Sequence, residues 1–173
     1  MQPFTFILAS ELDVRDDHVV AIKPDIESGQ LDKLEQGLSL YEELGDQSGI
    51  AASLNALAIS ARDRGDYSAA QSNFERSLAC WRMLLDRLEI ARCLHNLANV
   101  VKVRGDYPRA QWALCEATDI FEELGDRTGA AWSINQQGDI ASAQGDMAAA
   151  RGLFNVRFQP FGKPETSGVP RGP

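Results

Sequence analysis

Residues 44–70 read LGDQSGIAASLNALAISARDRGDYSAA, and residues 84–110 read LLDRLEIARCLHNLANVVKVRGDYPRA. Residues 124–150 carry the pattern a third time, as LGDRTGAAWSINQQGDIASAQGDMAAA, so a shift of 40 residues superposes the three stretches without a gap. Self-similarity at a fixed period of this length indicates a protein built by stacking one small structural unit. Six columns are identical in all three copies: Leu44/Leu84/Leu124, Asp46/Asp86/Asp126, Ala51/Ala91/Ala131, Gly65/Gly105/Gly145, Asp66/Asp106/Asp146 and Ala70/Ala110/Ala150.

Each copy predicts two helices. In the first half of copy one, small and apolar residues recur at intervals of three and four, which places them on one face of a helix. They are Ala51, Leu54, Leu57, Ala58 and Ala61. The second half has the same spacing, with Tyr67, Ala70, Phe74, Leu78, Trp81 and Leu84. We therefore expect an all-α chain whose helix pairs bury these faces against one another.

Two kinds of turn separate the predicted helices. Gly65 and its equivalents come where the first helix must end, and glycine readily adopts the left-handed conformation needed there. The aspartate that follows is suited to cap the second helix, and Pro108 is tolerated in a first turn. This turn also accounts for the RGD strings at 64–66 and 104–106 without an adhesion motif.

The junctions between copies read Leu44-Gly45-Asp46 and Leu124-Gly125-Asp126. Ser48 and Thr128 are expected to help start the helices that follow. In the middle junction Leu85 replaces the glycine. We expect that turn to be tighter, or the helix before it to be slightly longer.

Together, a small residue near the end of the first helix (Ala58, Ala98, Gly138) and a Gly-Asp-Tyr turn (65–67, 105–107) resemble the tetratricopeptide repeat over about residues 27–158. The period exceeds the ~34 residues usual for that family and lies at the edge of the HEAT and armadillo range, but the turn motif favours tetratricopeptide repeats. Long repeats with Leu-Gly-Asp-Arg resemble those of bacterial LuxR-type regulators and large signalling ATPases, and of Pins-like scaffolds. The resemblance implies an α-solenoid, a right-handed superhelix with first helices lining a concave groove.

The predicted organisation is a half copy followed by three copies. The half copy spans 27–46, and the copies span about 47–86, 87–126 and 127–158. Residues 1–26 lack the repeat columns and are expected to form an irregular lead. The third copy is expected to stop mid-helix at Arg157 and Gln159-Pro160, followed by a disordered tail over 159–173.

An array that stops in half a helix pair lacks the polar cap that such arrays need. This favours a fragment of a longer protein or an altered C-terminus. It also predicts an apolar end surface that self-associates or docks a neighbour, which light scattering would detect.

The implied groove carries polar residues one step round from the core stripe. Those we expect to bind a partner are Asn55, Arg62, Arg92, His95, Asn99, Lys102, Trp132 and Asn135. The middle set, Arg92, His95, Asn99 and Lys102, would form a basic strip able to hold a peptide backbone or a carboxylate. Trp132 is the strongest single hot-spot candidate, with packing on a neighbouring helix as the alternative. Trp81 is expected in the core.

Composition narrows the function classes. A net charge of −8 and a pI near 4.7 argue against direct nucleic-acid binding, which needs clustered Lys and Arg. The apolar run at 6–9 is too short for a signal peptide, and no stretch would span a membrane. Three cysteines without a CxxC pair fit a reducing cytoplasm, and Cys93 with His95 does not make a metal site.

No catalytic constellation or cofactor motif is present, so we expect neither an enzyme nor a cofactor. The first functional hypothesis is an interaction module that binds a protein partner's peptide or helix in the groove. The alternative is an effector-sensing regulatory segment of a larger bacterial transcription or signalling protein. The domains encoded beside this segment would discriminate the two.

Overall fold

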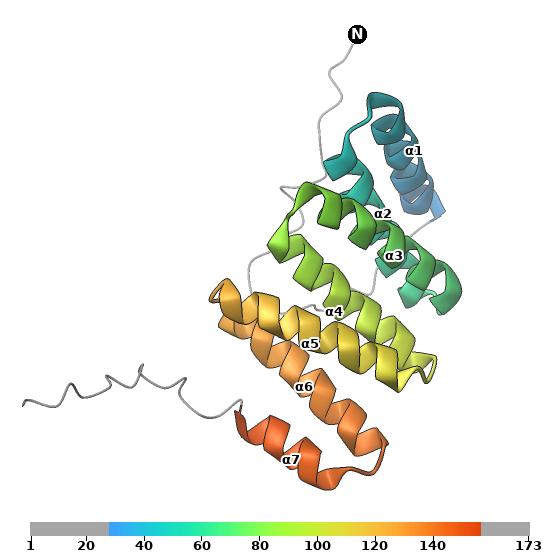
Figure 1. Cartoon of the computed structure of the whole chain (residues 1–173). Helices are drawn as coiled ribbons and strands as arrows, with labels where there is room; N and C mark the ends of the chain where they lie inside the picture. Colours follow the sequence, from blue (N-terminus) through green and yellow to red (C-terminus); the bar gives the residue numbers. More distant parts are fainter. Residues whose placement is uncertain (1–27, 157–173) are drawn as a thin grey trace, which may run out of the picture.

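The computed structural model describes residues 28–156, which form seven α-helices and no strand (Figure 1). The helices are α1 (Ser28–Leu44), α2 (Gln47–Asp63), α3 (Tyr67–Leu84), α4 (Arg87–Val103), α5 (Tyr107–Glu123), α6 (Arg127–Ala143) and α7 (Met147–Val156). The all-α prediction is confirmed. The expected lead, tail and stop at Arg157 lie outside the described residues.

Consecutive helices pack antiparallel, and the array is two layers deep. Second helices lie side by side, since Arg76 of α3 pairs with Glu42 of α1 at 3.4 Å and Arg82 of α3 pairs with Glu116 of α5 at 2.7 Å. First helices form the other layer, in which α4 contacts α6 directly.

The core follows the predicted stripes. All five stripe residues of α2 are buried, as are Ala70, Phe74, Leu78 and Trp81 of α3. Alanine at columns 70 and 110 is fully buried, which lets helix backbones come close. Two side chains tie the layers together: Ser77 Oγ donates to the Ala51 carbonyl at 2.8 Å, and Cys93 Sγ donates to the Phe74 carbonyl at 3.2 Å.

The prediction that Leu84 belongs to the core stripe is wrong. Leu84 is 42% exposed, and its equivalents Leu44 and Leu124 are exposed as well. These residues occupy the last turn of a second helix or directly follow it, next to the junction where the chain reverses. The following first helix starts beyond them and leaves them uncovered.

The turns within each copy are confirmed as predicted. Gly65, Gly105 and Gly145 adopt left-handed φ values of 81 to 83°. After Gly65, the Asp66 N–H donates to the Ala61 carbonyl at 2.9 Å, which closes the end of α2. The Asp66 carboxylate accepts from the Ala69 N–H at 3.0 Å and caps α3. One residue thus ends one helix and starts the next.

The junction turns use the same device, which the sequence analysis attributed in part to other residues. Asp46 and Asp126 are the caps, accepting from the Gly49 N–H at 3.1 Å and the Gly129 N–H at 2.9 Å. Ser48 and Thr128 instead lie exposed in the first turns of α2 and α6. A carboxylate placed at the helix start satisfies free N–H groups and suits the positive end of the helix dipole.

Leu85 keeps the junction turn without glycine. Its φ is 58°, the single positive value at a non-glycine residue within the described range, and α3 is one residue longer than α5. A side chain in this conformation costs about 1–2 kcal/mol because its Cβ crowds the following carbonyl. We expect Leu85→Gly to raise the free energy of unfolding by about 1 kcal/mol in urea titrations. Leu85→Ala, which removes the exposed side chain but keeps the crowding, is the control and should give no such gain.

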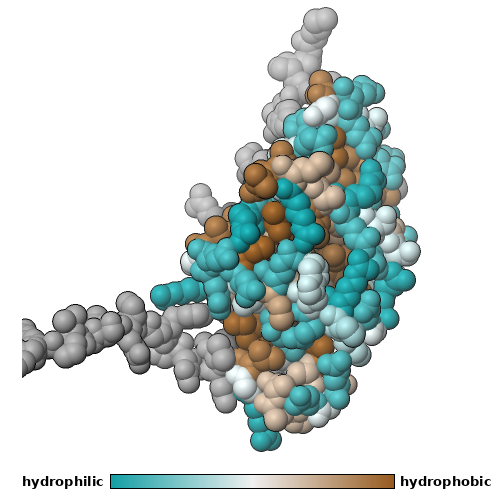
Figure 2. Space-filling view, viewed as in Figure 1, coloured by the Kyte–Doolittle hydropathy of each residue, from teal (hydrophilic) through white to brown (hydrophobic). Residues whose placement is uncertain are grey.

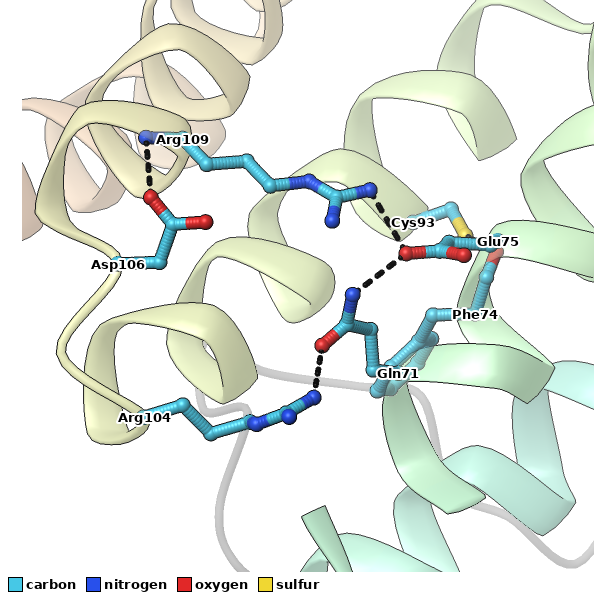
Figure 3. Close-up of polar contacts among 7 residues, drawn as sticks. All are labelled: Gln71, Phe74, Glu75, Cys93, Arg104, Asp106 and Arg109. Carbon is cyan, nitrogen blue, oxygen red and sulfur yellow. Dashed lines mark hydrogen bonds and ion pairs between the residues drawn. The ribbon is translucent and has the colours of Figure 1, made fainter. Parts of the chain in front are cut away.

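The outer surface of the second-helix layer carries a polar network (Figure 3). Glu75 of α3 accepts from Arg109 of α5 and from Gln71, both at 2.7 Å, and Gln71 in turn accepts from Arg104. These side chains are exposed or half-buried, so each pair contributes little alone. Together they link α3 to α5 and to the turn between α4 and α5.

Candidate protein-binding face

The eight predicted binding residues all lie on first helices, and we call their side of the layer the first-helix face. Asn55 and Arg62 come from α2, Trp132 and Asn135 from α6, and the other four from α4. Arg92 is exposed, while six of the others are half-buried. His95 departs from the prediction because it is only 6% exposed. The close approach of α6 to α4 covers it.

A hydrogen-bonded chain joins α4 to α6 through His95. Lys102 Nζ donates to Gln136 Oε1 at 3.5 Å, and Gln136 Nε2 lies 2.8 Å from His95 Nε2. An ammonium group can only donate, so the amide nitrogen of Gln136 must face the imidazole. His95 Nε2 is then the acceptor, and the ring proton sits on Nδ1, 3.1 Å from Ser133 Oγ. The chain therefore holds a neutral imidazole.

The surroundings of His95 keep it neutral over a wide pH range. Burial lowers the pKa of His95 from 6.5 to about 4, with further lowering by the charges of Lys102 and Arg62. The expectation that His95 adds to a basic strip is therefore wrong. At neutral pH it acts as a link between first helices.

The other cations among the eight predicted residues are mostly compensated. Arg62 pairs with Asp63 at 2.9 Å, and Arg92 pairs with Glu89 at 2.8 Å. Lys102 has a neutral partner, the Gln136 amide, and no carboxylate within the described residues. The strip thus reduces to one uncompensated cation on α4, beside the half-buried Asn99 on the same face.

Two amide oxygens on this face have no hydrogen-bond donor. They are Oδ1 of Asn55 on α2 and Oδ1 of Asn96 on α4, both buried from solvent. Asn55 and Asn96 are the equivalents, one repeat earlier, of His95 and Gln136, which are hydrogen-bonded to each other. Asn96 is 8% exposed, and a buried carbonyl without a partner costs about 1–3 kcal/mol. Asn96, Ser133 and Gln136 were not among the predicted site residues. A signal was present, because Asn96 and Gln136 are polar in a repeat column that holds Ala56 in copy one.

Trp132 follows the alternative that the sequence left open. Its indole is half-buried and tilted against His95, with ring centroids 6.4 Å apart and planes at 39°. Trp81 is buried in the core as predicted. Trp132 therefore packs against His95 while part of its surface stays exposed.

Other chemistry is not organised on the described helices. No group of three or more His, Cys, Asp or Glu residues there could hold a metal ion. Burial raises the pKa of Cys93 to about 12, so this thiol is a packing element rather than a nucleophile. Between residues 28 and 156, no helix has the length and apolar character to cross a membrane.

Comparison with known proteins agrees with this architecture. A family model described as Tetratricopeptide repeat matches residues 49–123, which include α2 to α5 apart from the first residues of α2. Residues 49–123 therefore resemble tetratricopeptide repeats. Members of this family generally mediate protein–protein interactions and typically act as non-enzymatic scaffolds.

A solved structure shows the same fold. BtubC (BKLC) from P. vanneervenii superposes with a TM-score of 0.68 at 20% sequence identity, over 82% of this chain and 64% of that one. This chain therefore spans less than two thirds of that protein's length. No curated protein matches the sequence.

Proposed function

We propose that the first-helix face of this tetratricopeptide-like array binds a peptide or helix of a protein partner. The observation that carries the proposal is the pair of buried oxygens, Asn55 Oδ1 and Asn96 Oδ1, that have no donor. Once the side chains that cover these oxygens move aside, a ligand with backbone N–H groups would supply donors to both. The cost of desolvating these oxygens would then be recovered on binding rather than on folding.

Charge and shape support the same ligand. Lys102, on the same helix as Asn96, is a cation without a carboxylate partner among the described residues and would favour a carboxylate, from a side chain or a chain end. Trp132 keeps part of an aromatic surface open at the α6 end of the face, where apolar side chains would gain most by burial. We keep all eight predicted binding residues in the proposal. Arg62 and Arg92 would contact the partner after exchanging their present carboxylate partners. His95 would hold α4 and α6 together rather than contact the partner.

The proposal is tested by selecting peptides that bind the full chain from a random displayed library. We expect Lys102→Glu with Asn99→Ala to weaken the selected peptides by at least about tenfold, the loss of one charge-assisted contact. Arg76→Glu, a charge change of the same sign on the second-helix layer, is the matched control and should leave affinity unchanged. Equal affinity for the first-helix variant and wild type would exclude this face.

A second variant separates binding from stability. Asn96→Leu replaces the unpartnered amide with an apolar side chain of similar size, so it should keep or raise the free energy of unfolding. The same change should weaken the selected peptides. Unchanged binding by Asn96→Leu would mean that the amide oxygens serve no ligand.

A further inference from the structure

A second exposed surface lies away from the first-helix face, along the turns that join one copy to the next. We call it the junction edge and define it as residues 42–47, 82–87 and 122–127. It exposes Leu44, Met83, Leu84, Leu85 and Leu124, with Leu44 at 70% and Leu85 at 79%. In Figure 2 hydrophobic residues appear on the left side of the array, where α3 meets α4 and α5 meets α6.

The turn geometry does not require leucine at this edge. At the opposite edge, the turns within copies use the same left-handed glycine and the same aspartate cap. There the residue before the glycine is Arg64, Arg104 or Gln144, in the position that Leu44, Leu84 and Leu124 occupy relative to the junction turns. Exposed apolar residues that the fold does not need, repeated in three consecutive units, indicate an interaction surface.

The charged residues around these leucines are mostly acidic. The junction edge holds seven carboxylates and three guanidinium groups, a net charge of −4, which is half of the net −8 of the whole chain. The equivalent residues of the opposite edge, 62–67, 102–107 and 142–147, balance to zero. Glu42 and Glu123 already pair with Arg76 and Arg87, whereas Glu43 and Glu122 have no basic partner among the described residues. A cationic partner would form ion pairs with Glu43 and Glu122.

The repeat spacing fits a helical partner. Ion pairs bring α1 against α3 and α3 against α5, so successive junctions lie roughly one helix diameter, about 10 Å, apart. An α-helix rises about 1.5 Å per residue and covers this distance in about seven residues. A second copy of the same edge would bring one net negative edge against another, which disfavours self-pairing.

We propose that the junction edge binds a basic amphipathic helix of another protein, with apolar residues about seven positions apart and Lys or Arg beside them. The apolar residues of that helix contact the Leu44, Leu84 and Leu124 positions in turn. Its cations face Glu43 and Glu122. This surface is separate from the first-helix face, so the proposal does not depend on the peptide site described above.

The test measures binding of three labelled synthetic helices to the full chain by fluorescence anisotropy. One carries leucine every seven residues with flanking lysines, the second has the same composition in scrambled order, and the third replaces lysine with glutamate. We expect the first helix to bind at least about tenfold more tightly than the other two, and to weaken as salt is raised. Equal binding of the three helices, or none, would overturn the proposal.

Variants of the chain locate the site. Leu44→Gln with Leu124→Gln removes the apolar contacts. Glu43→Lys with Glu122→Lys reverses the charge beside them without changing any packed side chain. Each pair should weaken the lysine helix at least about tenfold, and the charge reversal should favour the glutamate helix. Val103→Gln with Met147→Gln, equally exposed residues at the opposite edge, is the control and should change nothing. Loss of binding in the Lys102→Glu/Asn99→Ala variant instead would move the helix to the first-helix face and refute this assignment.

Discussion

Phe74→Ala is expected to remove about 3–5 kcal/mol from the free energy of unfolding. Phe74 is fully buried in α3, within the core shared by α2, α3 and α4. Truncation leaves a cavity that the neighbouring helices cannot fill, because each is fixed at both ends by a tight turn. Urea titration followed by circular dichroism measures the loss.

The position of Phe74 also predicts where the loss is felt. In a stacked array each unit contacts its neighbours alone, so amide exchange should accelerate most in α2 to α4 and least in α7. Phe74→Leu, which places the residue of the Leu114 column at this site, is the control and should cost about 1 kcal/mol. Uniform acceleration over all seven helices would show that the array unfolds as one unit and contradict this expectation.

Acidification should destabilise the array through His95. The folded protein holds His95 with a pKa of about 4, whereas the unfolded chain has the ordinary value of 6.5. Between these values the unfolded state binds the extra proton, so the free energy of unfolding falls as pH drops from 6.5 toward 4. The full loss is about 3 kcal/mol, and none of it is present above pH 7.5. Urea titrations at steps from pH 8 to 4 measure it.

His95→Asn is the matched variant, since Asn55 and Asn135 occupy the same column in the other copies. It removes the titrating ring, so the free energy of unfolding of the variant should fall less than that of wild type between pH 6.5 and 4. Protonated His95 Nε2 can no longer accept from Gln136. Nuclear magnetic resonance of the folded protein should therefore show the Gln136 amide signal shifting with a midpoint near the His95 pKa of about 4. Parallel pH profiles for wild type and variant would mean that the pKa of His95 is the same in the folded and the unfolded protein, contrary to this expectation.

The repeat made most of the fold predictable. Asp66 and Gly65 were readable because they recur at a fixed distance and because few residues tolerate a left-handed turn followed by a cap. Leu44 and its equivalents were misread because periodicity marks a helix face without showing where the next helix stops covering it. Only the packed array supplies that boundary.

Glycines within helices show a second limit. Gly129 stands in α6, where glycine costs about 1 kcal/mol relative to alanine, and its column carries Glu89 in copy two. A Cβ at Gly129 would lie 2.5 Å from Phe121 Cδ1, and one at Gly49 would lie 2.2 Å from Tyr41 Cδ1. The ring of the preceding second helix occupies that space, a contact between helices that a single helix pattern does not reveal.

The sequence placed the eight candidate residues on first helices, as the structure does. The helices and columns of the first-helix face were predictable, but the polarity of its residues was not, because that depends on partners 34 to 41 residues away. His95 looked like a donor and is a neutral link instead. Asn96 was not among the predicted residues, and its buried oxygen has no hydrogen-bond donor.

The shared aspartate at every turn has a mechanical consequence. Because Asp66 closes α2 with its N–H and caps α3 with its carboxylate, the connection contains no slack residue that could act as a hinge. Under tension we expect the array to lengthen by small sliding movements between neighbouring helices, distributed evenly along its length. A partner that stretches or compresses one part of the array would therefore change the pitch of the whole.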